Sequence, residues 1–304
     1  MGARIESVAT VHSHRGIFGR GGLRLSDAAA RACLERAERA AGDLDVLVNA
    51  GLYKERNMAE PALASIIQED IGANPGHPPR HDRHGTFSFD VMNGGCGVLT
   101  AAHLVDGFVS AGTAQLGMIV AADADPSPRS SRGFPFAPVG GAMLLEHTDE
   151  REGFTAFDFR TFTDFAELFE VRIRFDERSP GVFDHRGRNV LEVREGPTFA
   201  RQCVECAEAV ADGFLSRAGV SARDVDLLIA SQYPPSFADG VARALGIAMD
   251  RVPRVAPELG LANTAGVIAA LEAASESGQL ARAHHVLFVT AGAGITIGVA
   301  LYAK

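Results

Sequence analysis

The sequence predicts a layered α/β protein whose 304-residue chain contains two similar halves. Helical stretches, with apolar residues at intervals of three and four, alternate with short and fully apolar strands. Such strands belong in sheets that helices cover on both faces. The same order of elements then occurs twice along the chain. Two halves of this kind in tandem predict a pseudo-twofold arrangement of five layers, α/β/α/β/α.

The first part of the repeated unit is a helix followed by an apolar strand. From residue 28 the sequence AAARACLERAERAAGDLD has helical periodicity and leads into an apolar strand at 45–48. From residue 199 the sequence FARQCVECAEAVADGF has the same periodicity and leads to an apolar strand at 227–229. Each half is therefore expected to begin its core with the same helix–strand pair.

The second part of the unit is a buried helix, a glycine and two more strands. Residues 97–122 and 264–291 both read as a helix that ends before an apolar strand. A final apolar strand follows in each copy, at 140–146 and at 296–302. These pairs extend the internal similarity over nearly the whole chain.

The segment between the two copies is less regular and is rich in Phe, Arg and Asp. It is interpreted as an inserted cap or loop region. We therefore predict an N-terminal half at 1–150, an inserted region at 151–195 and a C-terminal half at 196–304.

Composition excludes several classes of function. The net charge of −9 argues against sequence-independent binding to nucleic acid or to an anionic membrane surface. No apolar run reaches the roughly 20 residues that span a bilayer, and the N-terminal sequence lacks the apolar core of a signal peptide. A cytoplasmic location is therefore expected. Cys203 and Cys206 form a C-x-x-C inside an amphipathic helix, where packing explains them better than metal or redox chemistry, so we expect no metal and no cofactor.

Four segments carry a resemblance to the thiolase superfamily, and in particular to the ketoacyl synthase III family. They are FSFDVMNGGCGVLTAAHLVDGFVSAG (87–112), FPFAPVGGAMLLE (134–146), VARALGIAMDRV (241–252) and AGAGITIGVALY (291–302). The resemblance implies the thiolase fold. It also implies a cysteine at a helix N-terminus that takes an acyl group from a thioester, with His and Asn that stabilise an enolate.

The family's three catalytic side chains are missing from the matching positions. Aligned without gaps, the Cys position falls on Gly95, the His position on Ser231 and the Asn position on Leu261. Cys96 lies one residue later, which turns a side chain by about 100° on a helix; it is either a displaced nucleophile or a small buried thiol. Asn263 lies two residues beyond Leu261, and a local shift would bring it into the Asn position.

A segment that binds the nucleotide of coenzyme A in relatives is also missing. Relatives carry a Trp and Arg residues there, whereas this chain has no Trp and passes through GIFGRGGLRLSD directly into its first helix. GRGG lacks the Gly-Lys-Ser/Thr ending of a phosphate loop and is interpreted as a turn. We therefore expect acyl-CoA substrates to be bound mainly by a partner protein.

Glu60 is the candidate catalytic residue that remains. It precedes Pro61 in the sequence MAEPALAS, which resembles the loop that crosses the dimer interface in relatives. In OleA-type enzymes, which join two fatty acyl thioesters head to head, a Glu from the neighbouring subunit resembles the base that removes an α-proton. The alternative is a helix N-terminal Glu that is favoured by the helix dipole.

The resemblance as a whole predicts an auxiliary subunit, inactive alone, of a heterodimeric acyltransferase. A triad-bearing ketoacyl synthase III-like homologue would be its partner, as in β-lactone pathways of the lipstatin type, and Glu60 would act in the partner's site during a Claisen condensation of two acyl-CoA thioesters. Two alternatives stay open. One is a purely structural partner subunit, and the other is an independent acyltransferase that uses Cys96.

Overall fold

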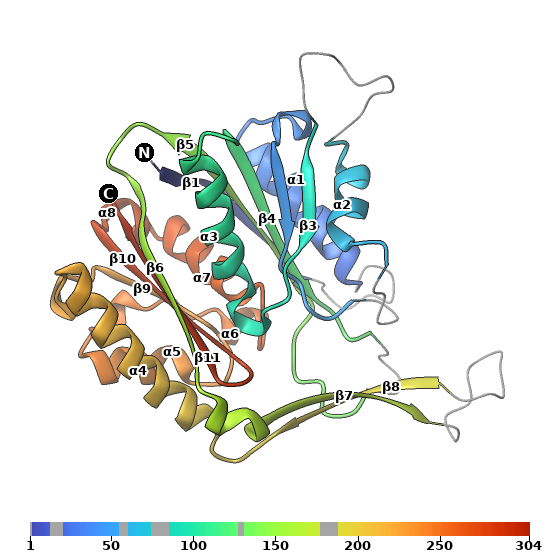
Figure 1. Cartoon of the computed structure of the whole chain (residues 1–304), viewed down its shortest axis with the longest axis vertical. Coiled ribbons are helices and arrows are strands. Elements are labelled where there is room, and N and C mark those ends of the chain that lie inside the picture. Colours follow the sequence, from blue (N-terminus) through green and yellow to red (C-terminus); the bar gives the residue numbers. More distant parts are fainter. Residues whose placement is uncertain (1, 13–20, 55–59, 74–84, 127–130, 177–187) are drawn as a thin grey trace.

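The computed structural model describes residues 2–12, 21–54, 60–73, 85–126, 131–176 and 188–304. Two sheets run through the molecule, one from each half of the chain (Figure 1). The first sheet has the strand order β1-β5-β4-β2-β3. Its strands are β1 (Gly2–His12), β2 (Val46–Asn49), β3 (Phe87–Asp90), β4 (Leu116–Asp123) and β5 (Val139–Thr148). The second sheet has the order β6-β11-β10-β9. Its strands are β6 (Gly153–Thr161), β9 (Leu227–Ala230), β10 (His285–Gly292) and β11 (Thr296–Ala303).

The two sheets share one pairing scheme, which is the structural form of the internal repeat. In the first sheet β2 is parallel to β4, β4 is antiparallel to β5, and β5 is antiparallel to β1. In the second sheet β9, β10, β11 and β6 follow the same sequence of parallel and antiparallel pairs. The first sheet also has β3, which pairs in parallel with β2 and forms the edge of that sheet.

Helices complete five layers. α1 (Gly22–Arg36) and α2 (Leu63–Ile71) cover the outer face of the first sheet, and α4 (Phe199–Ala218) and α5 (Phe237–Leu245) cover the outer face of the second. α3 (Gly97–Ser110) and α7 (Gly266–Glu276) lie between the sheets (Figure 1). Among the described residues, no helix is both long and apolar enough to cross a membrane. The predicted α/β/α/β/α layering is confirmed.

Shorter elements connect these layers. They are the helices α6 (Ala256–Leu259) and α8 (Gln279–Arg282) and the 3-10 turns η1 (Ala41–Asp43), η3 (Gly94–Cys96), η4 (Thr163–Leu168), η5 (Ala222–Asp224) and η6 (Met249–Arg251).

The apolar strands follow from burial on both faces. In β9, Leu227 and Ile229 face the middle helices, while Leu228 and Ala230 face α4 and α5. Successive side chains of a strand point to opposite faces, so a strand between two helical layers needs apolar residues at every position. Helices α2 and α4 end at Gly72 and Gly219, whose positive φ angles of 81° and 70° suit glycine.

The region expected as an insertion, 151–195, divides into two parts. Strand β6 pairs with β11 and belongs to the second sheet. As an edge strand it keeps partly exposed residues, which is why its sequence lacks the fully apolar pattern. The remainder includes β7 (Phe169–Asp176) and β8 (Arg188–Glu195), which pair as an antiparallel arm that extends from the body (Figure 1). The arm exposes apolar side chains at alternate positions of β7, namely Val171, Ile173 and Phe175.

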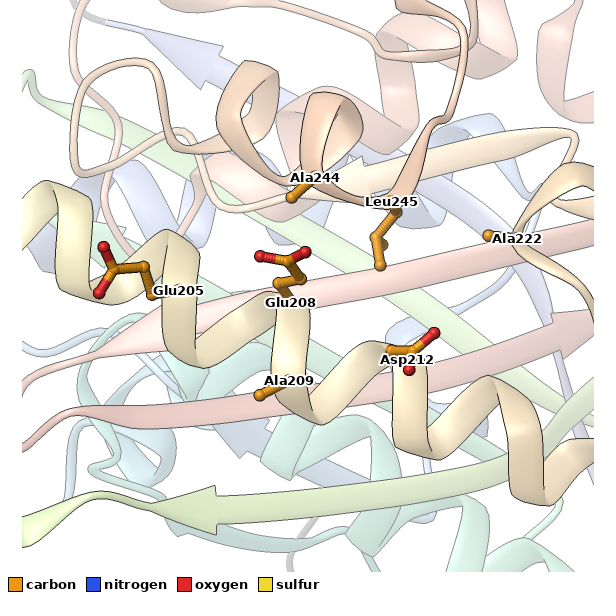
Figure 2. Close-up of a pocket in the computed structure, with 7 residues that line it drawn as sticks. All are labelled: Glu205, Glu208, Ala209, Asp212, Ala222, Ala244 and Leu245. Carbon is orange, nitrogen blue, oxygen red and sulfur yellow. The ribbon is translucent and has the colours of Figure 1, made fainter.

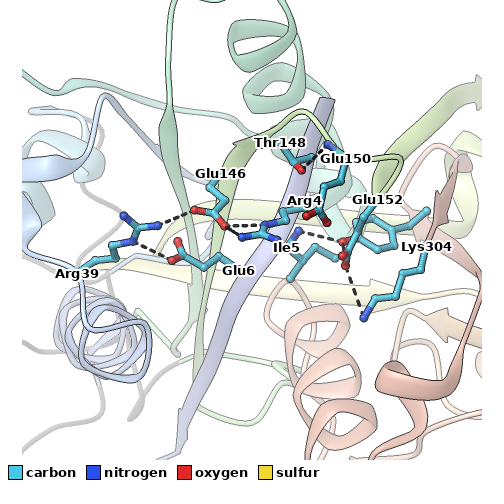
Figure 3. Close-up of polar contacts among 10 residues, drawn as sticks. Arg4, Ile5, Glu6, Arg39, Glu146, Thr148, Glu150, Glu152 and Lys304 are labelled. Carbon is cyan, nitrogen blue, oxygen red and sulfur yellow. Dashed lines mark hydrogen bonds and ion pairs between the residues drawn. The ribbon is translucent and has the colours of Figure 1, made fainter. Parts of the chain in front are cut away.

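A polar network joins the two ends of the chain at the edge of both sheets (Figure 3). Arg39 donates to Glu6 at 2.8 Å and to Glu146 at 2.6 Å. Arg4 pairs with the same Glu146. The Tyr302 hydroxyl accepts from the Ile5 amide at 3.2 Å and donates to Glu152 at 2.8 Å, which brings the last strand against the first. The Arg4 and Arg39 pairs lie within the first half, and the Tyr302 contact with Ile5 joins the two halves.

Candidate functional site

Two of the three positions that the resemblance assigns to catalytic residues, Gly95 and Ser231, meet around the end of β10. Gly95 lies in η3 immediately before α3, and Ser231 directly follows β9. Ala291, near the end of β10, contacts both: its amide donates to Ser231 Oγ at 3.2 Å, and its carbonyl oxygen faces Gly95. Parallel strands that end at one edge of a sheet, together with a helix N-terminus, therefore bring residues distant in sequence to one place.

Gly95 has no space for a side chain. A Cβ built on this residue would lie 2.2 Å from the carbonyl oxygen of Ala291, far closer than any real contact. A cysteine at this position would require the backbone of η3 or β10 to move. The backbone around position 95 therefore leaves no room for any side chain larger than that of glycine.

Cys96 points into the second sheet and not toward Ser231. It caps α3, is fully buried, and its Sγ lies 3.3 Å from the carbonyl oxygen of Thr296 on β11. Burial raises the pKa of this thiol to about 11, although hydrogen bonds with Thr290 and the Gly298 backbone act in the opposite direction. At neutral pH only about one thiol in 10⁴ would be ionised, whereas the thiolate is the nucleophilic form.

Ser231 and its neighbour Gln232 hold backbone. Ser231 is buried and accepts the Ala291 amide. The Gln232 side chain donates to the Ala230 carbonyl at 3.0 Å and accepts from the Val255 amide at 3.1 Å. These side chains lie where the resemblance places an enolate-stabilising imidazole, and they are engaged in fixing the ends of β9 and β10.

Leu261 and Asn263 lie in the loop between α6 and α7. Leu261 packs against the core under α4, and its carbonyl accepts from the Ala137 amide at 3.0 Å. The side-chain oxygen of Asn263 lies 3.7 Å from the position of a Cβ on Gly95. Of these two residues, Asn263 is the one whose side chain faces Gly95.

Asp123 connects this loop with the loop that leads toward Glu60. Its carboxylate, buried at the end of β4, accepts from the amides of Leu52 and Tyr53 at 3.0 and 3.1 Å. Its other oxygen accepts from the amide and the hydroxyl of Thr264, both at 2.8 Å. One buried carboxylate thus joins the segment after β2 to the residue next to Asn263.

Glu60 is exposed and lies just before α2. The preceding residues 55–59, part of the predicted interface loop, lie outside the described residues. On the described side of that gap, Lys54 forms a buried ion pair with Asp90 at the end of β3. Sequence reasoning missed Lys54, Asp90 and Asp123. A lysine within an otherwise apolar segment after β2 was the available signal for one of them.

An apolar surface, called here the β3–α3 face, is formed by β3, the residues just after it and α3. Phe87 and Met92 are 57% and 64% exposed, and Leu104 on α3 is 40% exposed. Phe87 also packs against the half-buried rings of Phe89 and Phe108, with centroids 5.2 and 6.1 Å away. Exposed apolar side chains gathered at an edge strand and the helix next to it are typical of a protein-interaction surface.

A pocket of about 340 Å³ lies elsewhere, between α4, α5 and η5 (Figure 2). Its lining residues are Glu205, Glu208, Ala209, Asp212, Ala222, Ala244 and Leu245. The pocket belongs to the outer helices of the second half and includes none of the residues around Ala291. In the part of the chain that the structure describes, His, Cys, Asp and Glu side chains form no group of three or more that could hold a metal ion.

Comparisons with known proteins identify a matching family model and several sequence relatives. Residues 215–304 match the family model of the 3-oxoacyl-[acyl-carrier-protein (ACP)] synthase III C-terminal domain. β-Ketoacyl-[acyl-carrier-protein] synthase III from Roseobacter denitrificans is 27% identical over 90% of this chain and 81% of its own length. The enzyme of the same name from Thiobacillus denitrificans is also 27% identical, over 91% of this chain and 82% of its own length.

Solved structures show the same fold. The 3-oxoacyl-[acyl-carrier-protein] synthase III of Aquifex aeolicus superposes with a TM-score of 0.78 at 18% identity and covers 100% of both chains. Xanthomonas campestris OleA, solved with bound lauric acid and lauroyl-CoA, superposes with a TM-score of 0.79 at 14% identity over 100% of this chain and 99% of its own.

The duplicated five-layer architecture and these superpositions define a thiolase-fold protein. Its sequence relatives are enzymes named β-ketoacyl-[acyl-carrier-protein] synthase III, at 27% identity, and residues 215–304 match the C-terminal model of that family.

Proposed function

We propose that this chain is the auxiliary subunit of a ketoacyl synthase III-like heterodimer that condenses two fatty acyl-CoA thioesters without decarboxylation. Its partner would be a homologue that keeps Cys, His and Asn, and Glu60 would act as the base in the partner's active site. The observation that carries this proposal is a contrast within one chain. Position 95 has no space for a side chain, while Glu60 is an exposed carboxylate just before α2, and the first two amides of α2 bind the end of the edge strand β3.

A condensation without decarboxylation needs a base, because no CO₂ leaves to generate the carbanion. In the proposed step, Glu60 takes an α-proton from the second acyl-CoA, and the resulting enolate attacks the carbonyl carbon of the acyl group held on the partner's cysteine. A carbon–carbon bond forms, the carbon–sulfur bond to the cysteine breaks, and a β-ketoacyl-CoA leaves. The cysteine thiolate then recovers the proton from Glu60. Placement by a neighbouring subunit gives the base the proximity that the step requires.

The β3–α3 face supports a partner at this side of the molecule. Within the described part of the chain β3 is an edge strand, so no described strand pairs with one row of its backbone groups. The exposed Phe87 and Met92 lie on or just after β3. Glu60 is three residues from Leu63, whose amide binds Asp90 at the end of that same strand. A subunit that covers the face would therefore lie close to Glu60.

The relatives indicate the substrate class. The sequence relatives act, by their names, on acyl groups carried by acyl carrier protein. One structural neighbour was solved with lauric acid and lauroyl-CoA, which are a fatty acid and its coenzyme A thioester. We infer fatty acyl thioesters for the pair proposed here, with the coenzyme A bound mainly by the partner.

The proposal is tested with Glu60→Gln. The chain is co-purified with homologues encoded by neighbouring genes, and the condensation of acyl-CoA pairs is measured. Loss of a general base typically lowers the rate by about 10²- to 10⁴-fold, so we expect a fall of at least roughly 100-fold with the complex intact. Glu69→Gln, an exposed carboxylate on α2, is the matched control and should leave the rate unchanged.

Other outcomes would identify the alternatives. Full activity of the Glu60→Gln pair, combined with no activity when this chain is omitted, would indicate a purely structural subunit. An independent acyltransferase would form an acyl adduct on Cys96 when the isolated chain is incubated with acyl-CoA. We expect mass spectrometry to detect no such adduct, because Cys96 is fully buried and its pKa is raised to about 11.

A further inference from the structure

We propose that Asp90 is a positioning residue that fixes Glu60 by holding both ends of the loop that carries it. This inference rests on the proposed function for what Glu60 does, and on geometry alone for what Asp90 does. Asp90 together with Lys54, Leu63 and Ala64 is called here the stem clamp.

The stem clamp joins chain segments on either side of Glu60. Before Glu60, the ammonium group of Lys54 forms an ion pair with Asp90 Oδ2. After Glu60, the Leu63 amide donates to Oδ2 at 3.0 Å and the Ala64 amide donates to Oδ1 at 2.8 Å. Asn49, at the end of β2, donates to Oδ1 at 3.2 Å. Every one of these donors points at one carboxylate at the end of β3.

Asp90 also does the work of a helix cap from outside the helix. The first amides of a helix have no partner within it, and a side chain at the N-cap usually accepts from them. The N-cap of α2 is Ala62, which offers no such side chain. Asp90 accepts from the first two helical amides, and its negative charge also suits the positive end of the helix dipole. The start of α2 is therefore fixed by a residue of the edge strand.

Burial makes the clamp stiff. The side chains of Lys54 and Asp90 are only 7% and 12% exposed. Burial by itself raises the pKa of Asp90, but hydrogen bonds from Lys54 and from the amides of Ala64 and Leu63 bring it below the ordinary value. The carboxylate is thus charged at neutral pH, as the clamp requires. Breaking a buried pair of this kind leaves a charge without a partner.

The tether between the clamp and Glu60 is short. Only Pro61 and Ala62 separate Glu60 from Leu63, so the Cα atoms of Glu60 and Leu63 lie within about 11 Å of each other. Pro61 follows Glu60 directly, and its ring fixes one of the backbone angles in that tether. A displacement of Leu63 would therefore also displace Glu60.

The first experiment measures the clamp in the isolated full-length chain. Amide hydrogen exchange is compared between the wild-type protein and Asp90→Asn. We expect the protection of the Leu63 and Ala64 amides to fall by roughly tenfold, with α3 unchanged. Lys54→Met tests the same clamp should Asp90→Asn fail to fold. Asp239→Asn, which removes a surface ion pair with Arg254, is the control and should leave α2 unchanged. Unchanged exchange at Leu63 and Ala64 would overturn the clamp.

The second experiment measures coupling to Glu60 in the active pair. Misplacing a catalytic group by ~1 Å can cost about 100-fold, so we expect Asp90→Asn to lower kcat at least roughly tenfold, with KM and the affinity of the two subunits within about twofold of wild type. In a double-mutant cycle, Asp90→Asn should lower kcat no further once Glu60→Gln is present. Additive losses would show that Asp90 acts independently of Glu60 and would overturn the positioning role.

The two proposals fail in different ways. Full activity of Glu60→Gln would show that Glu60 is not the base. It would also rule out the positioning role of Asp90, whatever the exchange data show. A large loss of kcat with Glu60→Gln, combined with an additive further loss from Asp90→Asn, would support Glu60 as the base and rule out only the positioning role of Asp90. Loss of protection at Leu63 and Ala64, a fall in kcat at constant KM and a non-additive cycle together support both.

Discussion

At the scale of single residues, the neighbouring residues Gly95 and Cys96 of the turn η3 have different surroundings. Gly95 faces the junction of Ala291, Ser231 and Asn263, but a carbonyl oxygen occupies the place of its side chain. Cys96 has a side chain, but it points into the second sheet and is buried. The turn therefore presents backbone at position 95, and the Cys96 thiol contributes to packing.

Gly95→Ala should destabilise the fold. The added Cβ would meet the Ala291 carbonyl oxygen at 2.2 Å, and overpacking of this kind costs about 1–3 kcal/mol. Gly107→Ala on α3 is the control, because a Cβ there has nothing within 4 Å and should stabilise the helix by about 0.5–1 kcal/mol. Urea unfolding of both variants measures the difference. Equal stability of Gly95→Ala and wild type would contradict the close approach of β10.

At the scale of elements, β3 connects most of the features that the proposals use. No described strand pairs with its outer edge, its residues Phe87 and Phe89 form part of the apolar face, and its last residue, Asp90, anchors α2. The helix α3 that follows it completes the β3–α3 face. One short strand thus lies between the expected partner and the loop that carries Glu60.

Met92→Asp should weaken assembly with the partner subunit without affecting the folded chain. Met92 is 64% exposed, so its replacement should change the free energy of unfolding by no more than about 0.5 kcal/mol. Loss of apolar burial and introduction of a charge at an interface should weaken the affinity of the pair at least roughly tenfold. Phe175→Asp, on the β7–β8 arm, is a matched control for an exposed apolar residue. Titration calorimetry compares the two, and an equal loss at both positions would contradict the β3–α3 face as the principal contact.

At the scale of the whole molecule, the duplicated architecture buries its thiols between layers. Cys33 lies on α1 against the first sheet, and Cys96 lies against the second. Burial raises the pKa of each thiol to about 11, although nearby hydrogen bonds lower it. In the unfolded chain these thiols ionise near pH 8.5. The folded protein therefore keeps both thiols neutral over a range of pH in which the unfolded chain ionises them.

Stability should consequently fall as the pH rises from about 9 to about 11. Below that range the thiols are protonated in both the folded and the unfolded state, and their full contribution to the free energy of unfolding is present. Above about pH 11 this contribution is lost, and the free energy of unfolding is lower by up to roughly 3 kcal/mol for each thiol. Urea unfolding between pH 7 and pH 11 checks this, and Cys96→Ala should show a smaller loss over the alkaline range than wild type. Parallel curves for the two proteins would contradict the raised pKa of Cys96.

Much of the fold could be predicted from the sequence, because the buried faces of helices and strands require apolar residues at regular intervals. The helices at α3 and α4 and the strands β2, β4, β9 and β10 all lie where apolar periodicity indicated them. Strand β6 was less visible, since an edge strand keeps exposed polar positions. Its membership of the second sheet depends on pairing with β11, a contact between residues far apart in the chain.

The sequence by itself determined the duplication, the layering and the identity of the residues at positions 95, 231 and 261, because these follow from local pattern and from composition. Only the tertiary structure decided that Ala291 closes the space at Gly95, that Asn263 faces that position, and that Asp90 binds both stems of the loop of Glu60. These are contacts between segments distant in sequence. No local preference encodes them, since each depends on where the ends of separate strands and helices meet once both sheets have formed.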